Sequence, residues 1–230
     1  MKKDIFLLDA DDTILDFHGA SNLGIRSVLQ EFGYEWKDEY GAIYKRLNDS
    51  LWAKLERGEL TREKLVEIRF PTYLELLGFT TVSGEKFNEK YLRYIAENPM
   101  FMQGGEDFLH KLPKFGRVYI VTNGSYVIQK SRFRIVEMDK YAEKIFISQE
   151  VGADKPSPVY TKFVLENIPD FDKARAVWIG DSLSADIKAA CEAGIDSIWY
   201  NPKNKPHSGA FLPTFTANSF EEIEKILGIF

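Results

Sequence analysis

Residues 4–13 read Asp-Ile-Phe-Leu-Leu-Asp-Ala-Asp-Asp-Thr, and this stretch decides the fold of the chain. Four consecutive apolar residues, 5–8, end abruptly at Asp9, Asp11 and Asp12. The length and composition of this run are typical of a strand buried on both faces of a parallel sheet. The acids then lie at its carboxyl end, where open α/β sheets bind ligands. Clustered carboxylates beside a buried strand are costly unless a cation or a reaction uses them; the alternative is a solvated acidic turn after an edge strand.

From Gly104 onward, apolar runs of strand length alternate with segments of helical periodicity. This alternation predicts a parallel, doubly wound sheet and therefore an α/β fold. The segment 201–213 is rich in Pro, Lys, Asn and Gly and is expected to be a loop. The expected strands cover 117–121, 144–147, 174–179 and 196–200, and the expected helices 106–112, 126–136, 158–167, 183–193 and 219–227.

Between the first strand and this alternating part, residues 20–97 carry helical patterns without a convincing buried strand. Thr61 is placed to cap one of these helices. We therefore divide the chain into a core of residues 1–16 and 99–230 and an inserted helical domain of residues 17–98. The expected helices of the insert are 21–32, 37–55, 61–77 and 83–96.

The composition limits the classes of function. The chain has 230 residues, 44% of them hydrophobic, which fits one α/β domain or a core with a smaller insert. A formal net charge of −5 argues against a nucleic acid polymer as partner, because its backbone favours a basic face. No apolar run approaches the roughly 18 residues that span a bilayer, and Asp4 follows too early for a secretory signal. We expect a cytoplasmic protein without a membrane partner; its oligomeric state stays open.

Polar residues also follow two of the other predicted strands. Thr122, Asn123 and Gly124 come directly after residues 117–121, where a hydroxyl group and two backbone amides beside a helix N-terminus can bind an anion. Lys155 lies in a loop that prolines restrict, and a fixed ammonium group can balance a reacting anion. Taken singly, the first group is also a common turn, and the lysine is also a common solvated loop residue.

A second acidic group, Asp181 and Asp186, follows the strand expected at 174–179. Gly180 permits a tight exit from that strand, after which Asp181 would face the same edge of the sheet. Asp186 lies in the first turn of the next helix, where the helix dipole by itself favours a carboxylate. The alternative is that Asp186 supports a metal site through water or through Lys155.

Together these residues resemble the four motifs of the haloacid dehalogenase (HAD) superfamily, in the family's order and each at a predicted strand end. The resemblance covers residues 4–200 and implies a Rossmann-like core with an inserted helical-bundle cap. The matching stretches are Asp9-x-Asp11-x-Thr13, Thr122-Asn123-Gly124, Lys155, and Gly180-Asp181 with Asp186.

The resemblance implies a phosphoryl-transfer site. Asp9 is implied as the nucleophile toward phosphorus and Asp11 as the general acid/base. Such chemistry needs one carboxylate that attacks while ionised and a second that protonates the leaving alkoxide and then activates water. Mg²⁺ is the implied cofactor, bound by Asp9, Asp181 and the backbone carbonyl of Asp11, because it offsets the repulsion between carboxylate and phosphate.

The remaining matching residues are implied to bind the phosphate or to support the site. Thr122, Asn123, Gly124 and Lys155 are expected to contact the phosphate, and Thr122 and Lys155 are also expected to act in catalysis. Supporting positions are expected for two further residues, Thr13 and Asp186, with direct contact between Asp186 and the metal as the less favoured alternative.

Asp11 separates two chemistries within the family, since dehalogenases lack the second Asp because a halide leaves without a proton. The chain further resembles the pyrimidine-type 5'-nucleotidases of bacteria. The stretches that carry this resemblance are Asp9-Ala10-Asp11-Asp12-Thr13, Asn48-Asp49-Ser50-Leu51-Trp52, Gly58, Leu60-Thr61, Arg69-Phe70 and Ile198-Trp199-Tyr200-Asn201-Pro202.

Four residues of the insert are candidates for contact with the substrate. Trp52 offers a stacking surface, Asn48 a hydrogen bond to a base edge, and Arg57 or Arg69 a charge. The alternatives are that Trp52 packs in the interior of the cap and that Arg57 is a solvated helix end.

Three functions remain open from the sequence. The first is a Mg²⁺-dependent phosphatase of nucleoside 5'-monophosphates, with a small phosphorylated metabolite as its partner. The second is a phosphatase of other small esters, such as phosphoglycolate or sugar phosphates, or a phosphomutase. The third is a non-catalytic binding protein, which the intact set of motif residues disfavours.

Overall fold

The computed structural model describes residues 3–207 and 209–229. In it the chain divides into two compact units. The core unit comprises the residues up to Asp16 together with those from Met100 onward, and the helical unit spans Phe17–Pro99.

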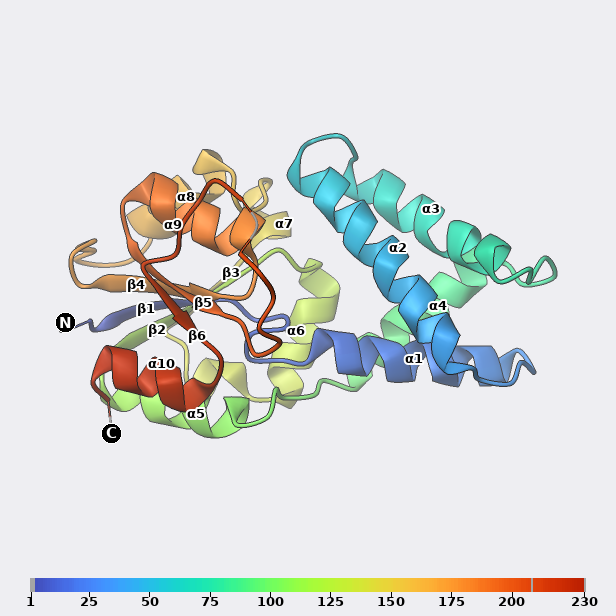
Figure 1. Ribbon diagram of the computed structural model, residues 1–230, viewed down its shortest axis with the longest axis horizontal. Helices are drawn as coiled ribbons and strands as arrows, with labels where there is room; N and C mark the ends of the chain where they lie inside the picture. Colours follow the sequence, from blue (N-terminus) through green and yellow to red (C-terminus); the bar gives the residue numbers. More distant parts are fainter. Residues whose placement is uncertain (1–2, 208, 230) are drawn as a thin grey trace. The chain divides into compact units, whose positions relative to one another are not determined.

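The core unit contains a six-stranded parallel sheet with the strand order β3-β2-β1-β4-β5-β6 (Figure 1). From β1 the chain builds the sheet outward on one side and then on the other, which confirms the predicted doubly wound α/β fold. The end of β1 thus lies where such sheets bind ligands. The strands are β1 (Ile5–Leu8), β2 (Arg117–Thr122), β3 (Lys144–Ile147), β4 (Ala176–Gly180), β5 (Asp196–Tyr200) and β6 (Phe215–Ala217).

Strand β1 is buried on both faces, as its apolar run predicts. Phe6 and Leu8 join a hydrophobic cluster with side chains of α5 and α10, whereas Ile5 and Leu7 join another with side chains of α8 and α9. Figure 1 shows these two pairs of helices on opposite faces of the sheet. The α-helices of the core are α5 (Gly105–Lys111), α6 (Tyr126–Ile135), α7 (Ser148–Val151), α8 (Pro158–Glu166), α9 (Lys188–Ala193) and α10 (Phe220–Leu227).

The register of the central strands brings distant parts of the sequence to one edge of the sheet. Leu8 is aligned with Ile120 of β2 and with Ile179 of β4, and the three strands run in the same direction. The backbone N–H of Asp9 continues this pairing by donating to the carbonyl oxygen of Ile179 at 2.9 Å. The residues that follow β1, β2 and β4 therefore emerge side by side.

The main differences from the predicted elements are local. Strand β6 lies outside the predictions because two of its three residues are exposed, so it carries little apolar pattern. The helix predicted at 183–193 is divided into a π-helical turn, Leu183–Ile187, and α9.

The helical unit consists of α1 (Phe17–Glu31), α2 (Asp38–Glu56), α3 (Arg62–Leu76) and α4 (Gly84–Glu97). The Thr61 hydroxyl oxygen accepts from the backbone N–H of Lys64 at 3.2 Å, which confirms the predicted helix cap. Buried aromatic rings form the interior of the unit; those of Phe70 and Tyr91, for example, have centroids 4.8 Å apart. Across the described residues of both units, the helices are too short or too polar to cross a membrane.

Candidate active site

Asp9, the first acid after β1, is held at both carboxylate oxygens. The Lys155 ammonium group donates to Oδ1 at 2.5 Å, and the Thr13 hydroxyl group donates to Oδ2 at 3.1 Å. Asp9 is 6% exposed. Two hydrogen bonds thus fix the orientation of a buried carboxylate at the carboxyl edge of the sheet.

Lys155 joins three parts of the site. Besides Asp9, its Nζ donates to Oδ1 of Asp186 at 2.7 Å and to the carbonyl oxygen of Val121 at 2.8 Å, so all three donors of the ammonium group are used. Burial by itself would lower the pKa of Lys155, but Asp186 and Asp9 outweigh this effect and raise the pKa above its usual value. The side chain therefore remains a fixed positive charge in the site.

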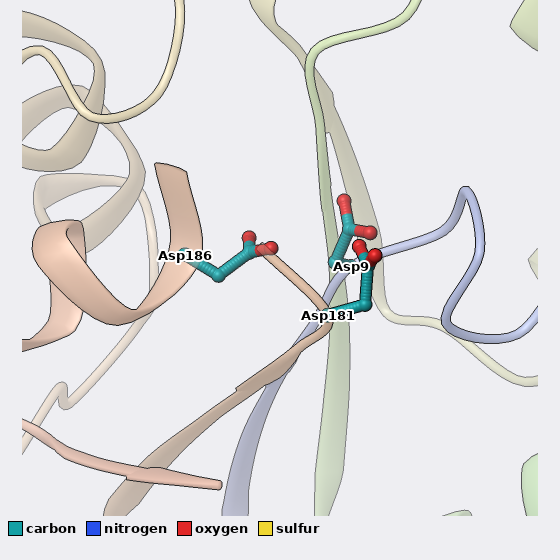
Figure 2. Close-up of side chains that lie close together, drawn as sticks. All are labelled: Asp9, Asp181 and Asp186. Carbon is teal, nitrogen blue, oxygen red and sulfur yellow. The ribbon is translucent and has the colours of Figure 1, made fainter. Parts of the chain in front are cut away.

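Asp9, Asp181 and Asp186 bring three carboxylates together (Figure 2). One oxygen from each lies within 4.8 Å of the others. Burial raises the pKa of Asp9 to about 7 against the opposing effect of Lys155. Burial, together with the charges of Asp12 and Asp9, raises the pKa of Asp181 well above its usual range. One ammonium group cannot balance three carboxylates, so the donor set fits a hard divalent cation such as Mg²⁺, which prefers oxygen ligands.

Asp186 is engaged by protein donors at both oxygens. Its Oδ1 accepts from Lys155 and from the indole N–H of Trp178 at 3.2 Å, and its Oδ2 accepts from the backbone N–H of Ser182 at 3.2 Å. These contacts hold the Asp186 carboxylate against Lys155, and the supporting role of Asp186 remains a prediction.

Gly180 leaves room for Asp186. A Cβ atom at Gly180 would lie 2.3 Å from Cγ of Asp186, which Trp178 and Lys155 prevent from moving aside. We expect Gly180→Ala to lower the free energy of unfolding by about 1–3 kcal/mol, the usual cost of overpacking, and to reduce activity by displacing Lys155. Thermal melts and initial rates measure the two effects. A Cβ atom at Gly180 would also lie 2.7 Å from Cβ of Asp186, so the matched background is Asp186→Gly, which removes both obstacles. In that background Gly180→Ala should cost little more; a fully additive cost would contradict this explanation.

At the end of β2, the side chains of Thr122 and Asn123 form hydrogen bonds with other residues of the site. Oγ1 of Thr122 accepts from the backbone N–H of Gly124 at 3.2 Å. The Asn123 side chain fixes the backbone of Lys155, because its Nδ2 donates to the carbonyl oxygen of Lys155 at 2.9 Å and its Oδ1 accepts from the backbone N–H of Lys155 at 2.7 Å. Contact of Thr122, Asn123 and Gly124 with a phosphate remains a prediction.

Asp11 contacts two residues that the sequence analysis does not single out. Its Oδ1 accepts from Nη1 of Arg132 at 2.5 Å, and its Oδ2 accepts from Nε2 of Gln129 at 2.9 Å. Both donors lie on α6. Their one-turn spacing is a visible signal for a shared helix face, but nothing in that spacing identifies Asp11 as their partner.

Asn48 and Arg69, two of the candidates for substrate contact, lie together inside the helical unit. Nη1 of Arg69 donates to Oδ1 of Asn48 at 3.4 Å, and both residues are buried. The Tyr44 hydroxyl group also donates to Oδ1 of Asn48 at 3.4 Å, and Nη2 of Arg69 donates to Oδ1 of Asn88 at 3.0 Å. The pair is thus part of a buried polar network.

The other two candidates have different surroundings. Trp52 lies one helical turn after Asn48 on α2 and is half-buried against a small cluster of leucines, with the Arg62 guanidinium 5.3 Å from its ring. Arg57 is exposed and pairs with the Glu59 carboxylate through two hydrogen bonds. The structure therefore pairs Asn48 of α2 with Arg69 of α3, places Trp52 one turn further along α2, and leaves Arg57 apart at the end of that helix.

A model of the haloacid dehalogenase-like hydrolase family matches residues 6–200 of the chain. The chain belongs to this family. This HAD hydrolase is 36% identical over 223 residues to YfnB of Bacillus subtilis, a protein named as a HAD-hydrolase, with 97% of this chain and 94% of that protein covered. A crystal structure of YfnB bound to magnesium superimposes with a TM-score of 0.93 over the full length of both chains, at 35% identity.

Two further relatives of the HAD hydrolase carry names that state an activity. The pyrimidine 5'-nucleotidase PynA of Streptococcus pneumoniae is 31% identical, with 94% of this chain and 92% of that protein covered. The pyrimidine 5'-nucleotidase YjjG of Escherichia coli is 28% identical, with 99% of both chains covered.

Proposed function

We propose that this HAD hydrolase is a Mg²⁺-dependent phosphatase of nucleoside 5'-monophosphates that acts through an aspartyl-phosphate on Asp9. The observation that carries the proposal is the buried Asp9 carboxylate, which Lys155 and Thr13 orient beside a second acid, Asp11. A halide needs no proton to leave, so Asp11 favours phosphate esters over haloacids as substrates.

The reaction has two halves. An oxygen of Asp9 attacks phosphorus, the bond from phosphorus to the alcohol oxygen breaks, and Asp11 gives its proton to that oxygen. Asp11, now ionised, takes a proton from a water molecule as the water attacks phosphorus. The bond from phosphorus to Asp9 then breaks, which releases phosphate and restores the carboxylate. Lys155 and the Thr122 hydroxyl group stabilise the charge on the transferring group.

Asp9, Asp181 and the backbone carbonyl of Asp11 would hold Mg²⁺. The ion would supply positive charge to the phosphoryl oxygens and offset their repulsion from the carboxylates. Asp186 would act indirectly by orienting Lys155.

The substrate class rests on PynA, YjjG and the residues of the helical unit. The core residues would contact only the phosphate and the metal. We therefore assign selection of the leaving group to the helical unit, which would act as a cap domain of residues 17–98. Half-buried Trp52, with Asn48 one turn before it on α2, suits a flat, partly apolar nucleoside that can stack on the ring and accept or donate a hydrogen bond at its base edge. We expect pyrimidine deoxyribonucleoside 5'-monophosphates to be preferred and the reaction to take place in the cytoplasm.

A phosphate-release screen with Mg²⁺ tests the proposal. It should include pyrimidine nucleotides, sugar phosphates and phosphoglycolate, each with and without excess chelator. Nucleotide hydrolysis that stops on chelation and returns with Mg²⁺ is expected. If a sugar phosphate were the best substrate, the nucleotidase assignment would be rejected and the phosphatase assignment would stand. Transfer of phosphate within a sugar would indicate a phosphomutase. Full activity in excess chelator would show that the reaction needs no metal.

Trp52→Ala should lower kcat/KM for thymidine 5'-monophosphate by about ten- to hundredfold, because stacking of a base on an aromatic ring contributes about 1–3 kcal/mol. Hydrolysis of p-nitrophenyl phosphate should change little, since that ester needs no base contact. Asn48→Ala should give the same selective loss in the same assays. The matched control is Trp36→Ala, which removes another half-buried tryptophan of the helical unit. Equal losses on both substrates together with a lower melting temperature would show that Trp52 is a packing residue.

A further inference from the structure

Two polar side chains of α6 are buried in the core unit, Gln129 and Arg132. Each is 1% exposed, although the neighbouring Lys130 and Arg134 of the same helix are exposed. Burying a guanidinium group is costly unless an opposite charge and hydrogen bonds compensate for the lost water. The contacts of these two side chains indicate what compensates here.

The two side chains form a continuous network of hydrogen bonds with Asp11 and Thr122. Nη1 of Arg132 donates to Oδ1 of Asp11 at 2.5 Å and to Oε1 of Gln129 at 2.8 Å. Nε2 of Gln129 donates to Oδ2 of Asp11 at 2.9 Å and to Oγ1 of Thr122 at 2.9 Å. Each oxygen of the Asp11 carboxyl group therefore has its own donor, and one amide group connects Asp11 to Thr122.

We propose that Gln129 and Arg132 are positioning residues, which fix the proton-transferring carboxyl group of Asp11 and couple it to the phosphate-binding hydroxyl group of Thr122. This inference rests on the proposed phosphatase activity. It adds two residues to the site. It also explains why α6 buries Gln129 and Arg132 alongside the apolar side chain of Phe133, which joins the hydrophobic core.

The contact with Asp11 leaves room for proton transfer. The Asp11 side chain is 28% exposed, so the two donors hold it from the protein side while part of the group faces outward. Each carboxylate oxygen has two lone pairs, and one donor on each leaves the other lone pair to carry the proton that passes to the leaving group and, after that transfer, to accept a proton from water. Fixing the carboxyl group in this way lowers the entropic cost of reaching the geometry for proton transfer.

The contact with Thr122 directs the hydroxyl hydrogen. Oγ1 of Thr122 accepts from Gln129 and from the backbone N–H of Gly124, which uses both of its lone pairs. Its hydrogen then remains available to a phosphate oxygen. The Gln129 side chain also passes so close to Gly124 that a Cβ atom there would lie 2.3 Å from Cγ of Gln129, so the glycine makes room for the positioning residue.

The test compares two leaving groups in the full-length protein. Arg132→Met keeps much of the side-chain volume and removes the donors to Asp11. Its kcat/KM for thymidine 5'-monophosphate, an alkyl ester, should fall by about ten- to a hundredfold, as for a displaced reacting group. Its kcat/KM for p-nitrophenyl phosphate should fall by less than about threefold, because nitrophenolate leaves with little protonation. The matched control, Arg134→Met on the exposed side of α6, should leave both values unchanged.

Gln129→Met provides a second measurement that does not depend on Arg132→Met folding. It should show the same preference for the aryl ester and, because Thr122 loses a partner, a raised KM for both esters. If Gln129 and Arg132 only stabilised the fold, both variants would have a lower melting temperature, and kcat/KM would fall equally for the two esters. Equal losses in either folded variant, or no loss in both, would overturn the proposal.

Asp11→Asn separates failure of this inference from failure of the proposed function. If wild type hydrolyses neither ester, the proposed phosphatase function fails, and if Asp11→Asn loses activity equally on both esters, Asp11 is not the acid/base and the proposed mechanism fails at that step. If Asp11→Asn discriminates strongly between the esters while Arg132→Met and Gln129→Met do not, the mechanism stands and the positioning role of α6 is rejected.

Discussion

Asp9→Asn is expected to lower turnover of every phosphate ester by about 10⁴-fold or more, as loss of the nucleophile does in other enzymes with covalent intermediates. The amide keeps the shape of the side chain and an oxygen near Lys155, but it cannot form the acyl phosphate. Phosphate release from thymidine 5'-monophosphate and from p-nitrophenyl phosphate measures the loss. Trapping of labelled phosphate on the protein should disappear in parallel.

The same variant is expected to stay folded. Burial holds the pKa of Asp9 in the folded protein near 7, above its ordinary value of 3.8, so without a metal the ionised carboxylate is destabilising. A raised carboxyl pKa means that stability falls as the pH rises from about 4 through about 7. In chelator at pH 8, Asp9→Asn should therefore melt no lower than wild type, and it should gain less than wild type from Mg²⁺. Substantial activity in the folded variant would reject Asp9 as nucleophile.

Asp11→Asn is expected to reduce kcat/KM for thymidine 5'-monophosphate by about 10²–10⁴-fold, the usual contribution of general acid/base catalysis. The loss should be much smaller for p-nitrophenyl phosphate, because nitrophenolate leaves without help from an acid. Asn retains the backbone carbonyl and an oxygen for one α6 donor, but its amide group cannot shuttle a proton. Steady-state rates on the two esters give the ratio that decides the role.

Asp4→Asn is the matched control for Asp11→Asn. It makes the same change at the other end of β1, where Asp4 forms an exposed ion pair with Arg175, and it should leave both rates unchanged. Equal losses on the two esters in Asp11→Asn would show that Asp11 has a structural role, through its contacts with Arg132 and Gln129.

The fold and the location of the site follow from local features of the sequence. The apolar run before Asp9 identifies a strand buried on both faces, and the alternation after Gly104 identifies a parallel sheet. Parallel strands end at a common edge, so the positions of Asp9, Thr122 and Asp181 after their strands suffice to predict one site. The apolar run that indicates a buried strand, and the helix between two strands that indicates a parallel pair, are both patterns of residues close in sequence. The sequence alone therefore predicts these features.

The partners of the site residues required the tertiary structure. Gln129 and Arg132 meet Asp11 across separations of 118 and 121 residues, which depends on how α6 is rotated about its axis against the sheet. In the same way, the sequence predicts a tight exit from the strand at Gly180, whereas the structure shows that the glycine makes room for Asp186. Side-chain contacts of this kind result from packing between elements, and the periodicity of a single segment contains no record of the side chain that faces it.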